Sequence, residues 1–311
     1  MRLFLGLILL LPIAAHASLG EGLERHHMKL AAESQLISHA RHGSRLLHHS
    51  VKTRYAVLYL HGLFESPHYN SGILETFHAA GMNVYAPLLA GHWRRDRRQS
   101  FELSHADWLR DLRDALELTR KLGDKILVAG FSTGGLLALR AALEHDDVAG
   151  LLLWAPALHL TQLTYWSVRY GQATGLTLND RLRLPADGFD VADYSPKLGH
   201  EVIELIRDTF RTHGAGLSAA ARRRSVGKKL NLPLFLVMSD VDDTADPRAL
   251  DEFFTSYAGP KERIRYRAAD DILHGNITKA PQDVFVGWED RFNFQFEEKR
   301  ARILNFLERL P

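Results

Sequence analysis

Short apolar runs alternate with longer amphipathic stretches along most of the chain. Five of these runs consist almost entirely of Val, Leu, Ile, Ala and aromatic residues, which is typical of strands covered on both faces of a sheet. They are residues 55–60, 83–87, 125–129, 150–154 and 234–238, and residues 263–266 are the expected last strand. We therefore expect a sheet that lies inside the molecule.

Two helical patterns lie between the predicted strands. Residues 104–122 begin with the capping box Ser104-His105-Ala106-Asp107, continue with an apolar stripe and end before Gly123. Residues 134–144 form a second helix, small and apolar at its start. Strands and helices that alternate in this order indicate parallel strands joined by right-handed crossovers, and hence an α/β fold.

The longest interval between two consecutive predicted strands separates the strand at 150–154 from the strand at 234–238. One crossover helix needs far fewer residues than this interval contains. The interval also has too few apolar runs to build a core of its own. We expect a domain at 51–311 with a largely helical cap inserted at about 157–230, over the ends of the strands.

The N-terminus has the three parts of a secretory signal peptide. Arg2 is followed by an apolar run at 3–15, and the segment ends Ala15-His16-Ala17 before Ser18. An uncleaved anchor helix is the alternative, but this run is shorter than the roughly 20 residues that cross a bilayer. The sequence predicts a signal peptide at 1–17, cleavage after Ala17, export to the periplasm or medium, and no membrane span.

Residues 18–50 are polar and rich in histidine. Six of the 17 histidines lie here: His26, His27, His39, His42, His48 and His49. A metal-binding tract is one interpretation. No pair has the H-x-x-x-H or H-E-x-x-H spacing with a carboxylate partner, so we expect a solvated N-terminal arm or an edge hairpin and no metal.

Composition narrows the possible functions. The 39 Lys and Arg against 37 Asp and Glu leave a formal charge of only +2. So small a net charge creates no positive electrostatic field that would attract nucleic acid, which disfavours a nucleic-acid-binding protein. The chain has no cysteine, which excludes disulfides, thiolate metal sites and a cysteine nucleophile. Any catalysis must use Ser, His, carboxylates or a metal site made of His and carboxylates.

A candidate nucleophile lies in Gly130-Phe131-Ser132-Thr133-Gly134, between a predicted strand and a predicted helix. A serine on such a tight turn is strained, and its neighbours two positions away must lack bulk. The start of the helix also supplies backbone N–H groups for a developing oxyanion. A serine hydroxyl is a weak nucleophile, so a base and a carboxylate that holds the base are needed.

At these residues the chain resembles the α/β-hydrolases, and among them the capped monoacylglycerol lipases and carboxylesterases. The resemblance implies the chain order serine, acid, histidine. The turn after residues 234–238 resembles the acid turn of this group and aligns Asp242 with the acid, while Asp243 is a close rival. His274 is the only histidine beyond that turn, which makes it the expected base.

The segment His61-Gly62-Leu63-Phe64-Glu65-Ser66 resembles the oxyanion loop of the same group. By this resemblance the backbone N–H groups of Leu63 and Thr133 face the oxyanion. We interpret His61 as a residue that ties the loop together by hydrogen bonds. The segment at 87–92 resembles another stretch of the group and is interpreted as structural.

The resemblance implies acyl transfer to water with no metal or organic cofactor. We expect carboxylic esters as substrates, acylglycerol-like, lysophospholipid-like or other small acyl esters, with Phe64, Phe131, Tyr165 and Trp166 as substrate-binding side chains. The aromatic residues of the cap alternatively pack the cap onto the body. The basic cluster at 222–229 either steers anionic lipids or is a solvated face.

Two other functions stay open at this point. A serine aminopeptidase needs a carboxylate cluster for the substrate amine, and Asp187, Asp190 and Asp193 in the cap allow one. A catalytically inactive binding module is the other, although such a module usually loses a member of the site. The sequence does not indicate an oligomeric state.

Overall fold

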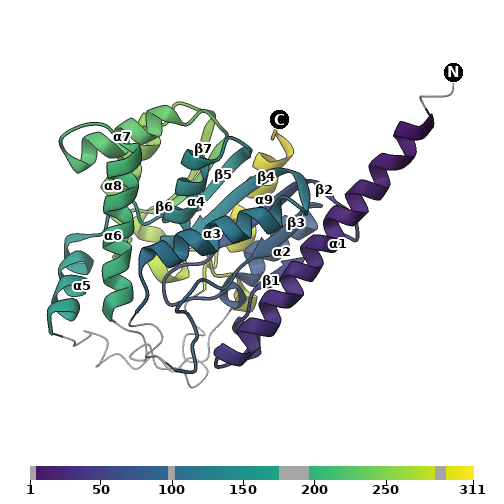
Figure 1. Ribbon diagram of the computed structural model, residues 1–311. Coiled ribbons are helices and arrows are strands. Elements are labelled where there is room, and N and C mark those ends of the chain that lie inside the picture. Colours follow the sequence, from purple (N-terminus) through teal and green to yellow (C-terminus); the bar gives the residue numbers. More distant parts are fainter. Residues whose placement is uncertain (1–4, 97–101, 175–195, 284–291) are drawn as a thin grey trace.

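The computed structural model describes residues 5–96, 102–174, 196–283 and 292–311. In this part of the chain seven strands form one sheet in the order β1-β3-β2-β4-β5-β6-β7 (Figure 1). Strand β1 is antiparallel to β3, and all other neighbours are parallel. The strands are β1 Arg45–Leu47, β2 Thr53–Leu60, β3 Asn83–Ala86, β4 Gly123–Phe131, β5 Val148–Trp154, β6 Leu234–Ser239 and β7 Lys261–Tyr266. All the strands predicted from apolar runs are present.

Helices connect the parallel strands and cover both faces of the sheet, with α3 and α4 on one face and α9 on the other (Figure 1). The helices are α1 Leu5–Leu36, α2 Ser71–Ala79, α3 His105–Thr119, α4 Thr133–Glu144, α5 Gln162–Thr174, α6 Pro196–His213, α7 Ala219–Lys229, α8 Pro247–Ser256 and α9 Phe296–Glu308. Helix α3 begins at the predicted capping box, where the Ser104 N–H donates to the Asp107 carboxylate at 2.8 Å. The α/β fold expected from the alternation of elements is confirmed.

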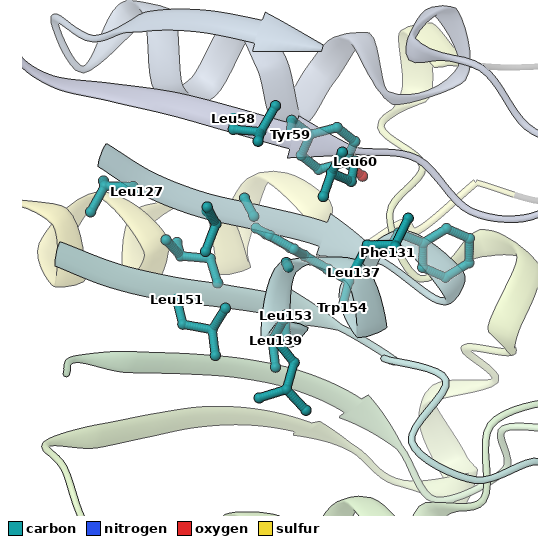
Figure 2. Close-up of a cluster of buried hydrophobic side chains, with 14 of the residues drawn as sticks. Leu58, Tyr59, Leu60, Leu127, Phe131, Leu137, Leu139, Leu151, Leu153 and Trp154 are labelled. Atoms are coloured by element: carbon teal, nitrogen blue, oxygen red, sulfur yellow. The ribbon is translucent and has the colours of Figure 1, made fainter. Parts of the chain in front are cut away.

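The core lies on the central strands, and its side chains fill both faces of the sheet (Figure 2). The register places Leu58, Val128 and Leu151 beside one another on β2, β4 and β5, and all three are fully buried. The register also aligns the carboxyl ends of the parallel strands at one edge. The loops that follow β2, β4, β6 and β7 therefore meet there, which is where open α/β sheets bind their ligands.

The described parts of the interval between β5 and β6 are largely helical, as predicted for the cap. It holds α5, α6 and α7, which stand to one side of the sheet in Figure 1. The cap carboxylates considered for an aminopeptidase, Asp187, Asp190 and Asp193, lie outside the described residues.

The expectation of a solvated arm at 18–50 is wrong. Residues 18–36 belong to α1, which lies against the body, and Leu19, His26 and Glu33 are buried. The Glu33 carboxylate accepts hydrogen bonds from the Ser44 N–H at 2.7 Å and the Ser44 hydroxyl at 2.6 Å, just before β1. The edge of the sheet is a single strand, β1, and not a hairpin. The amphipathic pattern of α1 is hard to see because two of its buried residues are polar.

Helix α1 continues back to Leu5, so the predicted cleavage site after Ala17 lies inside it. The N-terminal half of the helix projects beyond the sheet at the upper right of Figure 1. None of the helices in the described ranges combines the length and apolar character that a membrane crossing requires.

Candidate active site

Ser132 lies on the turn between β4 and α4, with φ 52° and ψ −117°. Residues other than glycine rarely adopt a positive φ, and doing so costs about 1–3 kcal/mol. The turn also brings its neighbours very close together. A Cβ on Gly130 would lie 2.4 Å from the carbonyl oxygen of Gly134, and a Cβ on Gly134 would lie 2.0 Å from that of Leu60. Only glycine fits at these positions, which explains the sequence pattern around Ser132.

Backbone hydrogen bonds hold Ser132 in this conformation. Its N–H donates to the carbonyl of Trp154 at 2.9 Å. Its carbonyl accepts from the N–H of Ala157 at 2.9 Å and from the N–H of Leu136 at 3.1 Å. The turn is thus fixed to the end of β5 and to the first turn of α4, so the hydroxyl has a defined position at the edge of the sheet.

His274 lies between the Ser132 hydroxyl and the Asp242 carboxylate. Its Nδ1 is 2.8 Å from Asp242 Oδ2, and its Nε2 is 2.9 Å from Ser132 Oγ. Because an ionised carboxylate only accepts hydrogen bonds, Nδ1–H is the donor, and Nε2 is left to accept the hydroxyl proton. All three residues are buried. The structure therefore brings together the three side chains that the sequence analysis had singled out.

Asp242 is distinguished from the other aspartates of its turn by its hydrogen bonds. Its Oδ1 accepts from the N–H of Thr244 at 2.9 Å and from that of Ala245 at 2.7 Å. Its side chain is 0% exposed. These bonds aim Oδ2 at the imidazole.

The rival aspartates point elsewhere. The Asp243 carboxylate accepts from the Thr244 hydroxyl at 3.3 Å, on the exposed side of the turn. Asp240 pairs with Arg265 at 2.6 Å, and Asp246 caps α8 by accepting from the Arg248 N–H at 3.0 Å. Of the aspartates in this turn, Asp242 is the one that reaches His274.

The loop after β2 lies directly against Ser132. A Cβ on Gly62 would lie 2.7 Å from the ring of Phe131 and 3.4 Å from Ser132 Cβ, so the loop backbone needs glycine to approach so closely. Leu63 follows, and Phe64 adopts a positive φ of 63°. Thr133 is the first residue of α4, where backbone N–H groups have no partner within the helix. Both expected oxyanion donors are therefore on segments that adjoin the serine.

His61 fixes this loop by hydrogen bonds, as the sequence analysis proposed. Its Nδ1–H donates to the carbonyl of Gly62 at 2.8 Å, and its Nε2 accepts from the N–H of Leu89 at 3.0 Å. Burial lowers the pKa of His61 well below its ordinary value, so the ring stays neutral and keeps this tautomer. The ring thus joins the loop after β2 to the loop after β3.

A buried ion pair between Glu65 and Lys279 was not found by sequence reasoning. The Lys279 side chain is 2% exposed and that of Glu65 is 13% exposed. Lys279 Nζ also donates to the carbonyl of Tyr69 at 3.2 Å and lies 5.6 Å from the centre of the Phe131 ring. The pair connects the segment after His274 to the loop that carries Leu63.

The four expected substrate-binding residues divide into two groups. Phe131 is buried, and its ring lies 4.8 Å from that of His274, while Phe64 lies on the loop beside Ser132. Tyr165 and Trp166 are on α5 in the cap, where Trp166 is 65% exposed and its ring contacts that of Tyr165.

Two of the six histidines of the N-terminal segment, His26 and His42, are buried and serve in packing. His42 is stacked on Trp93 with ring centres 3.4 Å apart, and its Nδ1 lies 2.9 Å from the Ser66 hydroxyl. Burial lowers the pKa of His42 to about 3 and that of His26 to about 4. Over the described ranges, no group of three or more His, Asp or Glu side chains is arranged to hold a metal ion.

Several known proteins share this architecture. The thermostable monoacylglycerol lipase of Bacillus sp. (strain H-257) is 26% identical over 216 residues, which cover 68% of this chain and 80% of that protein. A structure of the metagenome-derived lipolytic enzymes LipS and LipT superposes with a TM-score of 0.64 at 17% identity, covering 88% of this chain and 99% of that one. The Paleococcus ferrophilus monoacylglycerol lipase gives a TM-score of 0.58 at 18% identity, covering 85% and 97%. At these identities the two structures show a common fold.

The family assignment rests on a longer match. The family model described as serine aminopeptidase, S33, matches residues 51–275, which is more than half of the chain. The match runs from the start of the predicted domain through the loop after β2, the turn at Ser132 and the acid turn, and it ends just after His274. The chain belongs to the serine aminopeptidase S33 family, and it is a hydrolase with the α/β-hydrolase fold.

Proposed function

We propose that this chain is a serine hydrolase that cleaves carboxylic esters through an acyl-enzyme. Ser132 is the nucleophile, His274 is the base, and Asp242 is the carboxylate that orients the base. The observation that carries the proposal is the unbroken line of contacts from Asp242 through His274 to the Ser132 hydroxyl, 2.8 and 2.9 Å long. This is the arrangement that activates a serine at neutral pH.

The reaction follows from these positions. His274 takes the hydroxyl proton of Ser132 as Oγ attacks the ester carbonyl, and the N–H groups of Leu63 and Thr133 stabilise the oxyanion. His274 then gives its proton to the departing alcohol, which leaves an acyl group on Ser132. A water molecule, deprotonated by His274, attacks this acyl group and releases the acid. These steps need no metal or organic cofactor.

We propose acylglycerol-like or lysophospholipid-like esters, or other small acyl esters, as the substrates. The relatives named above are monoacylglycerol lipases and lipolytic enzymes. The aromatic rings of Phe64 and Phe131 beside the site suit an acyl or aromatic group better than a charged one. An aminopeptidase needs a carboxylate for the substrate amine, and Asp187, Asp190 and Asp193 lie outside the described residues.

The proposal includes export of the chain with cleavage after Ala17. Cleavage there leaves the residues of α1 that pack on the body. Leu19 is buried, and Glu21 pairs with Lys121 at 3.0 Å. The part of α1 that is removed is the part that projects beyond the sheet in Figure 1.

A panel of substrates tests the ester assignment. Wild-type protein, Ser132→Ala and the control Ser167→Ala, which changes a serine on α5, are incubated with p-nitrophenyl esters, monoacylglycerols, lysophospholipids and aminoacyl amides. We expect ester turnover by the wild type and the control, and a loss of at least about 10⁴-fold in Ser132→Ala. A fluorophosphonate probe should label the same two proteins. Faster turnover of aminoacyl amides than of esters contradicts the ester assignment, and equal activity of Ser132→Ala contradicts the nucleophile.

A further inference from the structure

The cap contains a cavity of about 330 Å³ between α5, α6, α7 and the segment that follows β5. One part of its wall is apolar and includes Leu160, Ile203 and Phe210. The polar part contains His159 and four arginines, namely Arg207, Arg211, Arg222 and Arg223. Among the described residues no Asp or Glu lines the cavity. Glu204 and Glu252, outside the lining, pair with Arg207 and Arg223. The cationic character of the polar side therefore comes mainly from Arg211 and Arg222.

Arg223 is buried without full compensation. Its side chain is 8% exposed, and its one ion pair in the described structure joins Nη2 to Glu252 at 3.3 Å. Its Nε is also buried and has no hydrogen-bond partner among the described residues. A buried, unsatisfied N–H on a guanidinium costs free energy unless a ligand supplies an acceptor.

Arg211 and Arg222 also have N–H donors that no described residue accepts. Arg211 makes no hydrogen bond or ion pair with any described residue. Arg222 donates from Nε to the carbonyl of Gly216 at 2.9 Å, which leaves the outer nitrogens of its guanidinium group available. Guanidinium groups bind carboxylates and phosphates in pairs of parallel hydrogen bonds. Arg207 already pairs with Glu204 at 2.6 Å and Arg223 with Glu252 at 3.3 Å. The donors that remain for a ligand are therefore those of Arg211 and Arg222 and the Nε of Arg223.

We propose that this cavity binds an acyl-chain amphiphile whose end is an oxyanion, either a carboxylate or a phosphate. The oxyanion lies against the four arginines, and the chain lies against Leu160, Ile203 and Phe210. The volume is at the lower end of the range of small-molecule sites, which suits one chain of medium length.

This site is separate from the catalytic side chains and does not depend on their assignment. Neither Ser132, Asp242 nor His274 lines the cavity. The backbone nevertheless links the two, since Leu160 forms a β-bridge with Ala245, whose N–H donates to Asp242. The cavity thus lies on the cap side of the acid turn.

Calorimetric titration of the full-length Ser132→Ala protein tests the proposal without interference from hydrolysis. The probes are dodecyl phosphate, dodecanoate, dodecanol and inorganic phosphate, each below its micelle concentration. We expect one of the two anionic amphiphiles to bind at least about tenfold more tightly than either dodecanol or inorganic phosphate. The tighter of the two identifies the end group as phosphate or carboxylate. If dodecanol binds as tightly as the better anionic amphiphile, the anionic part of the proposal is overturned. If inorganic phosphate binds as tightly, the apolar part is overturned. If no probe binds, both parts are overturned.

Variants locate the binding. Arg211→Gln/Arg222→Gln, which changes two side chains with few contacts, should weaken binding at least about tenfold, and Arg223→Gln should do the same if its melting temperature is retained. Arg224→Gln is the matched control, because Arg224 lies on the same helix, is 48% exposed and does not line the cavity. Equal weakening by Arg224→Gln, or no weakening by the double variant, places the ligand elsewhere and overturns the proposal.

Discussion

The ion pair between Glu65 and Lys279 allows a quantitative test of how the oxyanion loop is held. Lys279→Met keeps an unbranched chain of similar length but leaves the Glu65 carboxylate buried without its cation. Removing one partner of a buried pair costs about 3–5 kcal/mol. At about 2 °C for each kcal/mol in a large domain, the melting temperature should fall by about 6–10 °C.

Urea unfolding followed by tryptophan fluorescence measures this loss. The double variant Glu65→Gln/Lys279→Met should recover at least half of it, because no buried charge is then left unpaired. The control Lys52→Met changes a lysine that pairs with the exposed Asp124 at 3.1 Å. A surface pair of this kind contributes at most about 1 kcal/mol. Two results refute the reasoning. One is a loss of unfolding free energy in Lys279→Met that is no larger than in Lys52→Met. The other is a loss in the double variant that equals the sum of the losses in Glu65→Gln and Lys279→Met.

The same substitution should also slow the reaction. Glu65 Oε2 accepts from the Gly62 N–H at 3.4 Å and from Asn70 Nδ2 at 3.0 Å, so its position sets that of the loop carrying Leu63. Misplacing one oxyanion donor should lower kcat by about 10–100-fold while KM changes little. Turnover of a p-nitrophenyl ester at a temperature where the variant is folded measures this effect.

Three further outcomes are expected. Asp242→Asn should lower kcat by about 10³–10⁴-fold and Asp243→Asn by less than about tenfold, and the reverse ranking in ester hydrolysis would assign the acid to Asp243. Burial lowers the pKa of His42 in the folded chain to about 3, whereas the unfolded chain keeps the ordinary value of about 6.5. Because the unfolded chain therefore takes up the proton first, the folded chain loses stability as the pH falls below about 6.5. The unfolding free energy of the wild type should drop by about 3 kcal/mol relative to His42→Gln between pH 6.5 and pH 4, as measured by urea titration. N-terminal sequencing of the exported protein should begin at Ser18, and a cytoplasmic protein that begins at Met1 contradicts export.

Apolar runs were sufficient to predict the central strands because strands buried on both faces leave a strong local signal. The first strand gave no such signal. Residues Arg45–Leu47 form only a short, half-buried edge with one antiparallel neighbour. Helix α1 was missed for a different reason, since its inward face includes His26 and Glu33, and the partner of Glu33 is Ser44, in the loop before β1.

The candidate site was predictable to the extent that its residues follow strands. The strain at Ser132 demands glycines nearby, so the turn is visible in the sequence itself. Spacing favoured Asp242 over Asp243 but did not exclude Asp243, because both lie in one tight turn. It depends on which carboxylate the N–H groups of Thr244 and Ala245 hold, and that is a property of the folded turn.

Lys279 and Arg223 show what a pattern of polar and apolar positions cannot predict. Charged side chains are expected at the surface, and their burial is tolerated only with partners. The partner of Lys279 is 214 positions away along the chain, and that of Arg223 lies on a different helix. For Lys279 the partners described account for its burial beside the Phe131 ring. For Arg223 the described partners leave Nε without a hydrogen bond. Because of this difference, Lys279 is interpreted as holding the loop and Arg223 as binding a ligand.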